Sequence, residues 1–217
     1  MKSLAFRGID FTEVQRVMDF GCGHAADITE LALAHPHLQL HGYTLSAGQV
    51  EVGRERIRRL GLDGRANVHQ RDSAKQPFPG RFDLVFGFEV LGLIEDKPAL
   101  FRNIASSLQP GGRLVVVDFI AVEAAIHNPQ TSSYTDTKER WSELLADEKL
   151  RVLECVDVSP EIGRFLLDPD YEQHVRELVA EHRFDEITDR HLRSQDNIGK
   201  ALRGGVMQYV LLTAQRD

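Results

Sequence analysis

The stretch Val17-Met18-Asp19-Phe20-Gly21-Cys22-Gly23-His24 decides the fold of this chain. A short apolar run that carries an acid ends in two glycines at alternate positions, and a helical pattern follows directly. Glycine lacks a Cβ, so the backbone can turn tightly after a strand and let a ligand approach closely. The stretch therefore predicts a loop that binds a nucleotide cofactor. A purely structural glycine turn is the alternative, because a glycine motif is weak evidence by itself.

Ala26 completes the pattern G-x-G-x-x-A, which also allows a dinucleotide site. Such a site holds a pyrophosphate at a helix N-terminus and places an acid about twenty residues further on, against a ribose hydroxyl. Here the next apolar run, residues 38–43, ends in Thr44 instead. The carboxylate of Asp19 would repel a pyrophosphate but attract the ammonium of an amino-acid-like ligand. S-adenosylmethionine carries that ammonium and no phosphate, so the loop matches it better than NAD.

Length and composition limit the classes of protein to which this chain can belong. Its 217 residues suffice for one α/β domain, and its 42% apolar and 27% charged content is that of a soluble globular protein. The 26 basic and 33 acidic residues give a net charge of -7, which argues against nucleic acid or an anionic membrane as partner. No signal peptide is recognised, and two cysteines provide neither a disulfide framework nor a zinc spacing. We expect a cytoplasmic protein without a metal site.

Apolar runs alternate with helical patterns, which predicts an α/β fold with a parallel sheet wrapped by helices. Strands are expected at Arg16–Phe20, Gln39–Tyr43, Ala66–Gln70, Phe82–Phe88, Gly112–Phe119, Leu150–Asp157 and Val206–Ala214. Helices are expected at Ala25–Ala34, Ser46–Leu60, Lys97–Ser107, Thr137–Asp147, Pro160–Glu181 and Ser194–Arg203. Residues 158–205 thus insert about two helices before the last strand. Ligands of open α/β sheets lie beyond the carboxyl ends of the strands, so this insertion is expected to be a substrate lid or, alternatively, a surface decoration.

Three further stretches join the glycine loop: Gly42-Tyr43-Thr44-Leu45-Ser46 with Gln49, Arg71-Asp72-Ser73-Ala74, and Leu108-Gln109-Pro110-Gly111-Gly112-Arg113-Leu114. With them the chain resembles the class I S-adenosylmethionine-dependent methyltransferases over nearly its whole length. Phe86-Gly87-Phe88-Glu89-Val90 and the residues from Tyr209 to Ala214 resemble, more narrowly, methyltransferase domains embedded in modular polyketide synthases. The resemblance implies one domain over residues 1–217, a Rossmann-like seven-stranded, mostly parallel sheet with helices on both faces and an antiparallel last strand. It also implies S-adenosylmethionine as cofactor.

The resemblance further implies which residues contact the cofactor: Asp19, Gly21, Cys22, Gly23, Thr44, Gln49, Asp72, Ser73 and Phe88. Asp19 and the glycines would lie along the methionine portion. Asp72 would accept the adenine amino group, since a carboxylate is an acceptor without a donor. The family commonly has an acid where this chain has Thr44, and the Thr44 hydroxyl and the Gln49 side chain would together replace it at the ribose.

The side of the methyl acceptor departs from the family pattern. A neutral hydroxyl or an α-carbon needs a general base, usually a histidine. Related domains often carry a His-His pair just after Phe-Gly-Phe-Glu-Val, where this chain has Leu91-Gly92-Leu93. Glu89, at the carboxyl end of the fourth strand, and His127, in the loop after the fifth, are therefore the candidate catalytic residues.

The resemblance implies O-methylation of a hydroxyl or enol on a polyketide intermediate, carried by an acyl carrier protein through phosphopantetheine and handled together with other domains of a synthase. C-methylation of the same class of substrate is one alternative. A non-catalytic domain that keeps the fold is another, because the histidine pair is missing. Residues 1–15 are expected to be the remnant of an N-terminal lid, on the phrase from Phe6 to Phe11.

Overall fold

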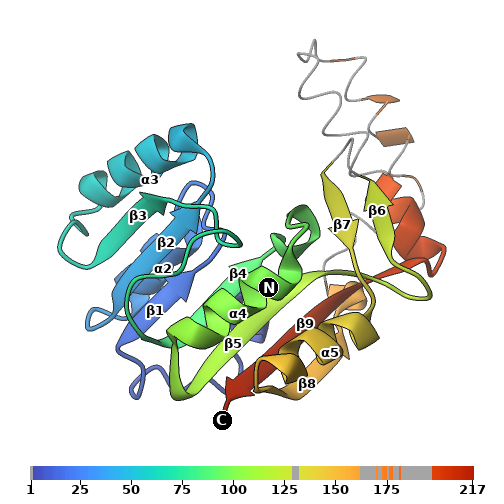
Figure 1. Cartoon of the computed structure of the whole chain (residues 1–217). Coiled ribbons are helices and arrows are strands. Elements are labelled where there is room, and N and C mark those ends of the chain that lie inside the picture. Colours follow the sequence, from blue (N-terminus) through green and yellow to red (C-terminus); the bar gives the residue numbers. More distant parts are fainter. Residues whose placement is uncertain are drawn as a thin grey trace.

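The computed structural model describes residues 2–128, 132–161, 170, 173–174, 176–177, 181 and 197–217. A seven-stranded sheet runs through it in the order β3-β2-β1-β4-β5-β9-β8 (Figure 1). The pairs among β1 to β5 are parallel, and β9 is antiparallel to both of its neighbours. The predicted Rossmann-like sheet with an antiparallel last strand is confirmed.

All seven predicted strands are present: β1 (Arg16–Asp19), β2 (Gln39–Thr44), β3 (Ala66–Gln70), β4 (Phe82–Phe88), β5 (Leu108–Ala121), β8 (Leu150–Asp157) and β9 (Met207–Arg216). The predicted start of β5, at Gly112, was too late. Phe82 pairs with Leu108 and Leu84 already pairs with Arg113, so an irregularity in the ladder accommodates the intervening Pro110 and glycines. A short hairpin of β6 (Ile126–Asn128) and β7 (Ser133–Thr135) was not predicted.

The helices are α1 (Lys2–Ala5), α2 (Ala26–Ala34), α3 (Ala47–Arg59), α4 (Lys97–Ser107) and α5 (Lys138–Asp147), with the 3-10 turns η1 (Leu91–Leu93) and η3 (Ser159–Glu161). Capping fixes where the longer ones begin. The side chains of Ser46, Asp96 and Thr137 each accept a hydrogen bond from a backbone N–H in the first turn of α3, α4 and α5.

Helices cover both faces of the sheet, as predicted. On one face, apolar side chains of α1, α2 and α3 pack on the strands, among them Ile28, Leu31 and Ile57. On the other face lie α4 and α5 (Figure 1). Trp141 of α5 is the largest fully buried side chain among the described residues. The helices that follow β1 and β2 cover one face, and those that follow β4 and β5 cover the other. The strand order therefore switches direction between the neighbouring strands β1 and β4, and their carboxyl ends border the crevice that such sheets use for ligands.

Of the two segments predicted as lids, residues 1–15 are described from residue 2 onward and residues 158–205 only in part. Phe6 packs against Phe86 and Phe88 on the sheet, and Arg113 donates a hydrogen bond to the carbonyl of Gly8. Most of the insertion 158–205, including most of the predicted helix Pro160–Glu181, lies outside the described residues. The described residues 173–174, 176–177, 181 and 197–203 are helical. Both lids stay predictions. No helix among the described residues is long and apolar enough to cross a membrane.

Candidate active site

A cavity of about 470 Å³ opens at the carboxyl ends of β1 to β4. Its wall consists of the glycine loop, the residues that join β2 to α3, residues 71–75 after β3, and residues of the segment 89–95 after β4. The sequence singled out each of these segments, and the fold brings them together. Residues 108–114, which the sequence also singled out, do not line this cavity. A second cavity of about 390 Å³ lies at the opposite end of the sheet, between residues 8–14 and 109–113. That end carries none of the predicted site residues.

The glycine loop is held between two strands. Phe20 donates its backbone N–H to the carbonyl of Phe86, and Cys22 donates to that of Tyr43, at 3.0 and 2.9 Å. Gly21 has no room for a side chain, because a Cβ would lie 2.4 Å from a methyl carbon of Val90. The backbone of this loop therefore forms the cavity wall itself.

The thiol of Cys22 does not line the cavity. It is buried in the core against Gly42, where a Cβ would lie 2.6 Å from the sulfur, and burial raises the pKa of the thiol. The ring of Phe88 is half-buried and packs against the core, on Phe6 and Phe86. Both residues were predicted from the sequence to contact the cofactor, and the structure places their side chains behind the wall.

Asp19 lies directly beneath the glycine loop. Its side chain is 2% exposed and accepts a hydrogen bond from the N–H of Gly21 at 3.0 Å. Burial raises the pKa of Asp19 to about 8, and no cation among the described residues offsets this effect. A buried carboxyl in this state is matched to a cationic group of a ligand.

Thr44 and Gln49 form the side of the cavity next to β2. The Thr44 hydroxyl donates to the Gln49 amide oxygen at 2.5 Å, and Ser46, the cap of α3, accepts from the backbone N–H of Gln49 at 3.3 Å. The helix start thus fixes the amide against the strand end. The pair retains amide N–H donors and hydroxyl lone pairs, which are the groups that replacement of a carboxylate at the ribose would need.

The turn after β3 presents Asp72 to the cavity. One carboxylate oxygen accepts the N–H groups of Ala74 and Lys75, at 3.1 and 3.2 Å, and the other lies 3.5 Å from the Lys75 ammonium. The Ser73 hydroxyl is buried and donates to the carbonyl of Phe20 at 2.8 Å. Ser73 therefore joins this turn to the glycine loop, while Asp72 both shapes the turn and lines the cavity.

Two residues of this region could not be found from sequence patterns. Asn103 on α4 donates its amide to the carbonyls of Ser73 and Ala74, both at 3.0 Å. Tyr209 on β9 donates its hydroxyl to the carboxylate of Glu89 at 2.8 Å. Each contact joins segments far apart in the chain, and no local motif signals it.

Glu89 and the turn η1 form the end of the cavity next to β4. Glu89 has a positive φ of 54°, and Asp118 accepts the N–H of Leu91 at 2.6 Å beneath it. Burial raises the pKa of Asp118 to about 6, and the neighbouring Glu89 contributes. At Gly92 a Cβ would lie 3.8 Å from oxygens of Asp118 and Thr135, which is an ordinary contact distance. The structure therefore has room for a Cβ at this position.

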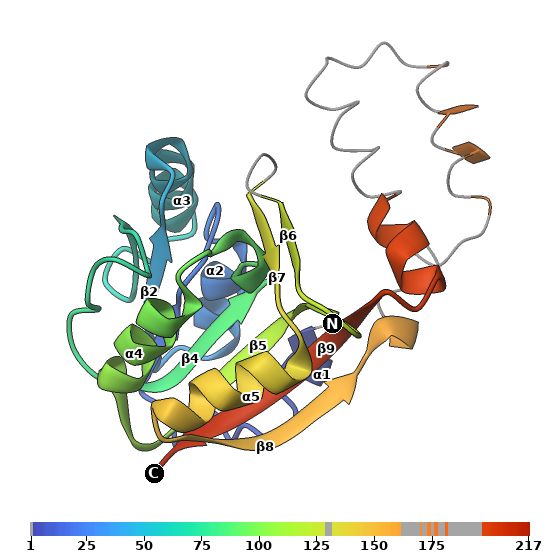
Figure 2. The same ribbon diagram turned by 45° about the vertical axis from the view of Figure 1, so that its right-hand side comes forward.

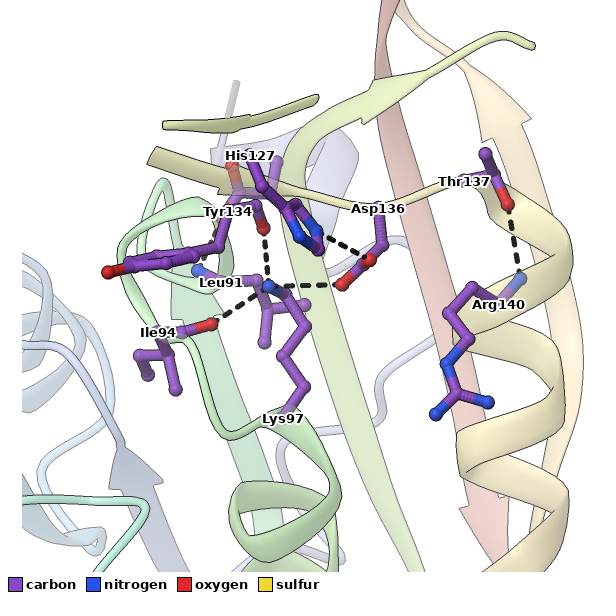
Figure 3. Close-up of polar contacts among 9 residues, drawn as sticks. Leu91, Ile94, Lys97, His127, Tyr134, Asp136, Thr137 and Arg140 are labelled. Atoms are coloured by element: carbon purple, nitrogen blue, oxygen red, sulfur yellow. Dashed lines mark hydrogen bonds and ion pairs between the residues drawn. The ribbon is translucent and has the colours of Figure 1, made fainter. Parts of the chain in front are cut away.

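His127 lies on the β6–β7 hairpin, which stands beside η1 (Figure 2). Its Nε2 lies 3.1 Å from one oxygen of Asp136, whose other oxygen lies 3.1 Å from the ammonium of Lys97 (Figure 3). Lys97 is 1% exposed and also donates to the carbonyls of Ile94 and Tyr134. The His127 side chain is 51% exposed and is absent from the cavity wall.

The described site holds a buried acid, a hydroxyl–amide pair and a second acid around a glycine loop, which is the class of site that the sequence predicted. A family model described as "Methyltransferase domain" matches residues 11–191. The chain belongs to this methyltransferase domain family, and the predicted class, an S-adenosylmethionine-dependent methyltransferase, is confirmed.

Its relatives include proteins of polyketide biosynthesis. Polyketide synthase ThaQ of Burkholderia thailandensis is 38% identical over 98% of this chain, but the chain spans only 10% of that protein. The O-methyltransferase of a trans-AT polyketide synthase from Brevibacillus brevis, solved with S-adenosyl-L-homocysteine, is 34% identical with a TM-score of 0.90, covering all of this chain and 71% of that one. The StiE O-methyltransferase, 45% identical, matches with a TM-score of 0.86 over all of this chain and 72% of that one.

Proposed function

We propose that this domain transfers a methyl group from S-adenosylmethionine to a hydroxyl or enol oxygen of a polyketide-type acyl intermediate bound to a carrier protein. The proposal rests on the cavity at the carboxyl ends of β1 to β4, where the wall and Asp19 beneath it offer partners for the ammonium, the ribose and the adenine of that cofactor. The names of the similar synthase O-methyltransferases support oxygen as the acceptor.

Residues of the wall, together with Asp19 beneath the glycine loop, fit successive parts of the cofactor. Asp19 would pair with the ammonium, the Thr44–Gln49 pair would bind the ribose hydroxyls, and the Asp72 oxygen that faces Lys75 would accept the adenine amino group. Bound S-adenosylmethionine supplies an electrophilic methyl group on a positively charged sulfur. The work of the protein is then to align an acceptor oxygen and to exclude water.

Methylation of a hydroxyl also releases a proton, so an acceptor for this proton is needed. Glu89 is the candidate that we favour, because it lines the cavity at the end of β4. His127 is the second candidate, because its ring is oriented by Asp136 on a hairpin next to the same turn. Its use would require the substrate to bind between the hairpin and the cavity.

Transfer of labelled methyl from S-adenosylmethionine to a 3-hydroxyacyl chain on an acyl carrier protein tests the function. We expect a labelled methyl ether, with loss of turnover in Glu89→Gln exceeding that in His127→Ala. Label on carbon from a 3-oxoacyl chain would assign C-methylation instead. Tight cofactor binding without product from either carrier-bound chain would identify a non-catalytic domain. This is the alternative that Gly92 raises, because related domains often carry a histidine there.

A further inference from the structure

Glu89 has an unusual backbone at the mouth of the cavity. Its φ of 54° lies in the left-handed region, which residues other than glycine rarely adopt. Its N–H donates to the carbonyl of Val117 at 2.9 Å, which ties it to β5. This conformation turns the side chain across β5 toward β9, where Tyr209 meets it.

Tyr209 is a rigid partner for that carboxylate. Its side chain is 2% exposed, its ring packs on Phe119 with centroids 4.6 Å apart, and its N–H donates to the Ser159 hydroxyl at 2.9 Å. Burial raises the pKa of Tyr209, and the carboxylates of Glu89 and Asp118 raise it further, so the phenol stays neutral. A neutral phenol has one hydrogen to donate, and Glu89 receives it at 2.8 Å.

The charge at this end of the cavity is negative. The wall from residue 89 to 95 contains Glu89 and Glu95 and no basic residue, and Asp118 lies behind it. The basic residues of the wall, Arg71 and Lys75, belong to the segment after β3, where Lys75 pairs with Asp72. A cation is therefore favoured next to Glu89 over a neutral group of the same shape.

We propose that Tyr209 is a positioning residue that holds the carboxylate of Glu89 in the cavity, where its charge makes the site prefer the sulfonium cofactor over the neutral thioether product. This inference rests on the proposed function, since it presumes that the cavity binds S-adenosylmethionine. It adds a way to release the product: the positive charge on sulfur disappears when the methyl group leaves, and the attraction to Glu89 disappears with it.

Calorimetry with S-adenosylmethionine, S-adenosylhomocysteine and sinefungin tests this without an acceptor substrate. Sinefungin carries an amine in place of the methylated sulfur and is not consumed. We expect the wild type to bind the two charged ligands about tenfold more tightly than S-adenosylhomocysteine, as a partly screened charge pair would give. Glu89→Gln should bring this ratio close to one, and Tyr209→Phe should lower it at least threefold.

Two comparisons separate positioning from a merely structural role. Tyr209→Phe should have no further effect on the ratio in the Glu89→Gln background, because Tyr209 acts through that carboxylate. Tyr43→Phe is the matched control, since Tyr43 is also a buried strand tyrosine but its hydroxyl has no hydrogen-bond partner among the described residues. Its ratio should equal that of the wild type.

An unchanged ratio in Glu89→Gln would overturn the inference, and so would a Tyr209→Phe variant that behaves like Tyr43→Phe. Glu89 is exposed at the cavity, so Glu89→Gln provides a result even if loss of the buried hydroxyl impairs folding. A wild type that binds none of the three ligands would instead overturn the proposed function.

Discussion

At the scale of single residues, Asp19 couples the stability of the ligand-free protein to pH. Its pKa is about 8 in the folded chain against 3.8 for an ordinary aspartate. Between these values the folded state binds a proton that the unfolded state does not, so the free energy of unfolding falls as pH rises. Above pH 8 both states are ionised and this dependence ends.

We predict that Asp19→Asn removes this component. The amide introduced by this substitution keeps an acceptor for the N–H of Gly21 but cannot ionise. Between about pH 5 and 7 the wild type should lose about 1.4 kcal/mol per pH unit relative to the variant, measured by urea unfolding without ligand. Parallel curves for the two proteins would show that Asp19 is ionised throughout.

The Thr44–Gln49 pair supplies a second prediction at this scale. Thr44→Ala with Gln49→Ala should weaken S-adenosylhomocysteine binding about tenfold, since roughly one or two net hydrogen bonds are lost, while the free energy of unfolding changes little. Calorimetry measures the affinity. Thr213→Ala with Gln215→Ala is the control. These two side chains lie on β9 away from the cavity, and they donate hydrogen bonds to Glu154 on β8 and to the carbonyl of Gly111 on β5. Equal affinity of both double variants would contradict the ribose assignment.

At the scale of elements, Lys97 joins three of them. Lys97 lies in the first turn of α4, and its ammonium donates to the carbonyl of Ile94, which follows η1. It also donates to the carbonyl of Tyr134 on β7 and pairs with the carboxylate of Asp136 just after β7 (Figure 3). Burial lowers the pKa of Lys97, whereas Asp136 opposes this effect. This one side chain therefore holds the hairpin of His127 against the turn that borders the cavity.

We predict that Lys97→Met costs about 3–5 kcal/mol of unfolding free energy, because it leaves the Asp136 carboxylate without its buried partner. Lys97→Met with Asp136→Leu should recover part of this loss. Arg102→Met on the same helix is the control, because the Arg102 side chain is exposed and its ion pair with Glu148 should contribute no more than about 1 kcal/mol. Urea unfolding measures all three. A loss in Lys97→Met no greater than in Arg102→Met would contradict the anchoring role.

At the scale of the whole molecule, the cavity lies where helices switch from one face of the sheet to the other, and its wall comes from four segments. A bound ligand contacts all four segments, so it should raise the free energy of unfolding of the whole domain. S-adenosylhomocysteine at about one hundred times its Kd should add about 2.7 kcal/mol and raise the Tm by roughly 5–10 °C. NADH should leave the Tm unchanged, because Thr44 stands where a dinucleotide site has the acid that binds the ribose. A shift with NADH alone would restore the dinucleotide interpretation.

The sequence by itself determined the sheet, most strand limits and the segments that line the cavity. Apolar runs and glycine turns are local signals, and Asp19, Gly21, Thr44 and Asp72 lie at or just after the ends of their strands, so parallel strands carry them to one edge. Tertiary structure alone decided that the Cys22 thiol and the Phe88 ring face the core, that β6 and β7 form a hairpin, and that Tyr209 meets Glu89. The orientation of a side chain at a strand end depends on which neighbouring elements pack there. The hydrogen bond between Tyr209 and Glu89 joins residues far apart in the chain, and no local sequence pattern encodes either outcome.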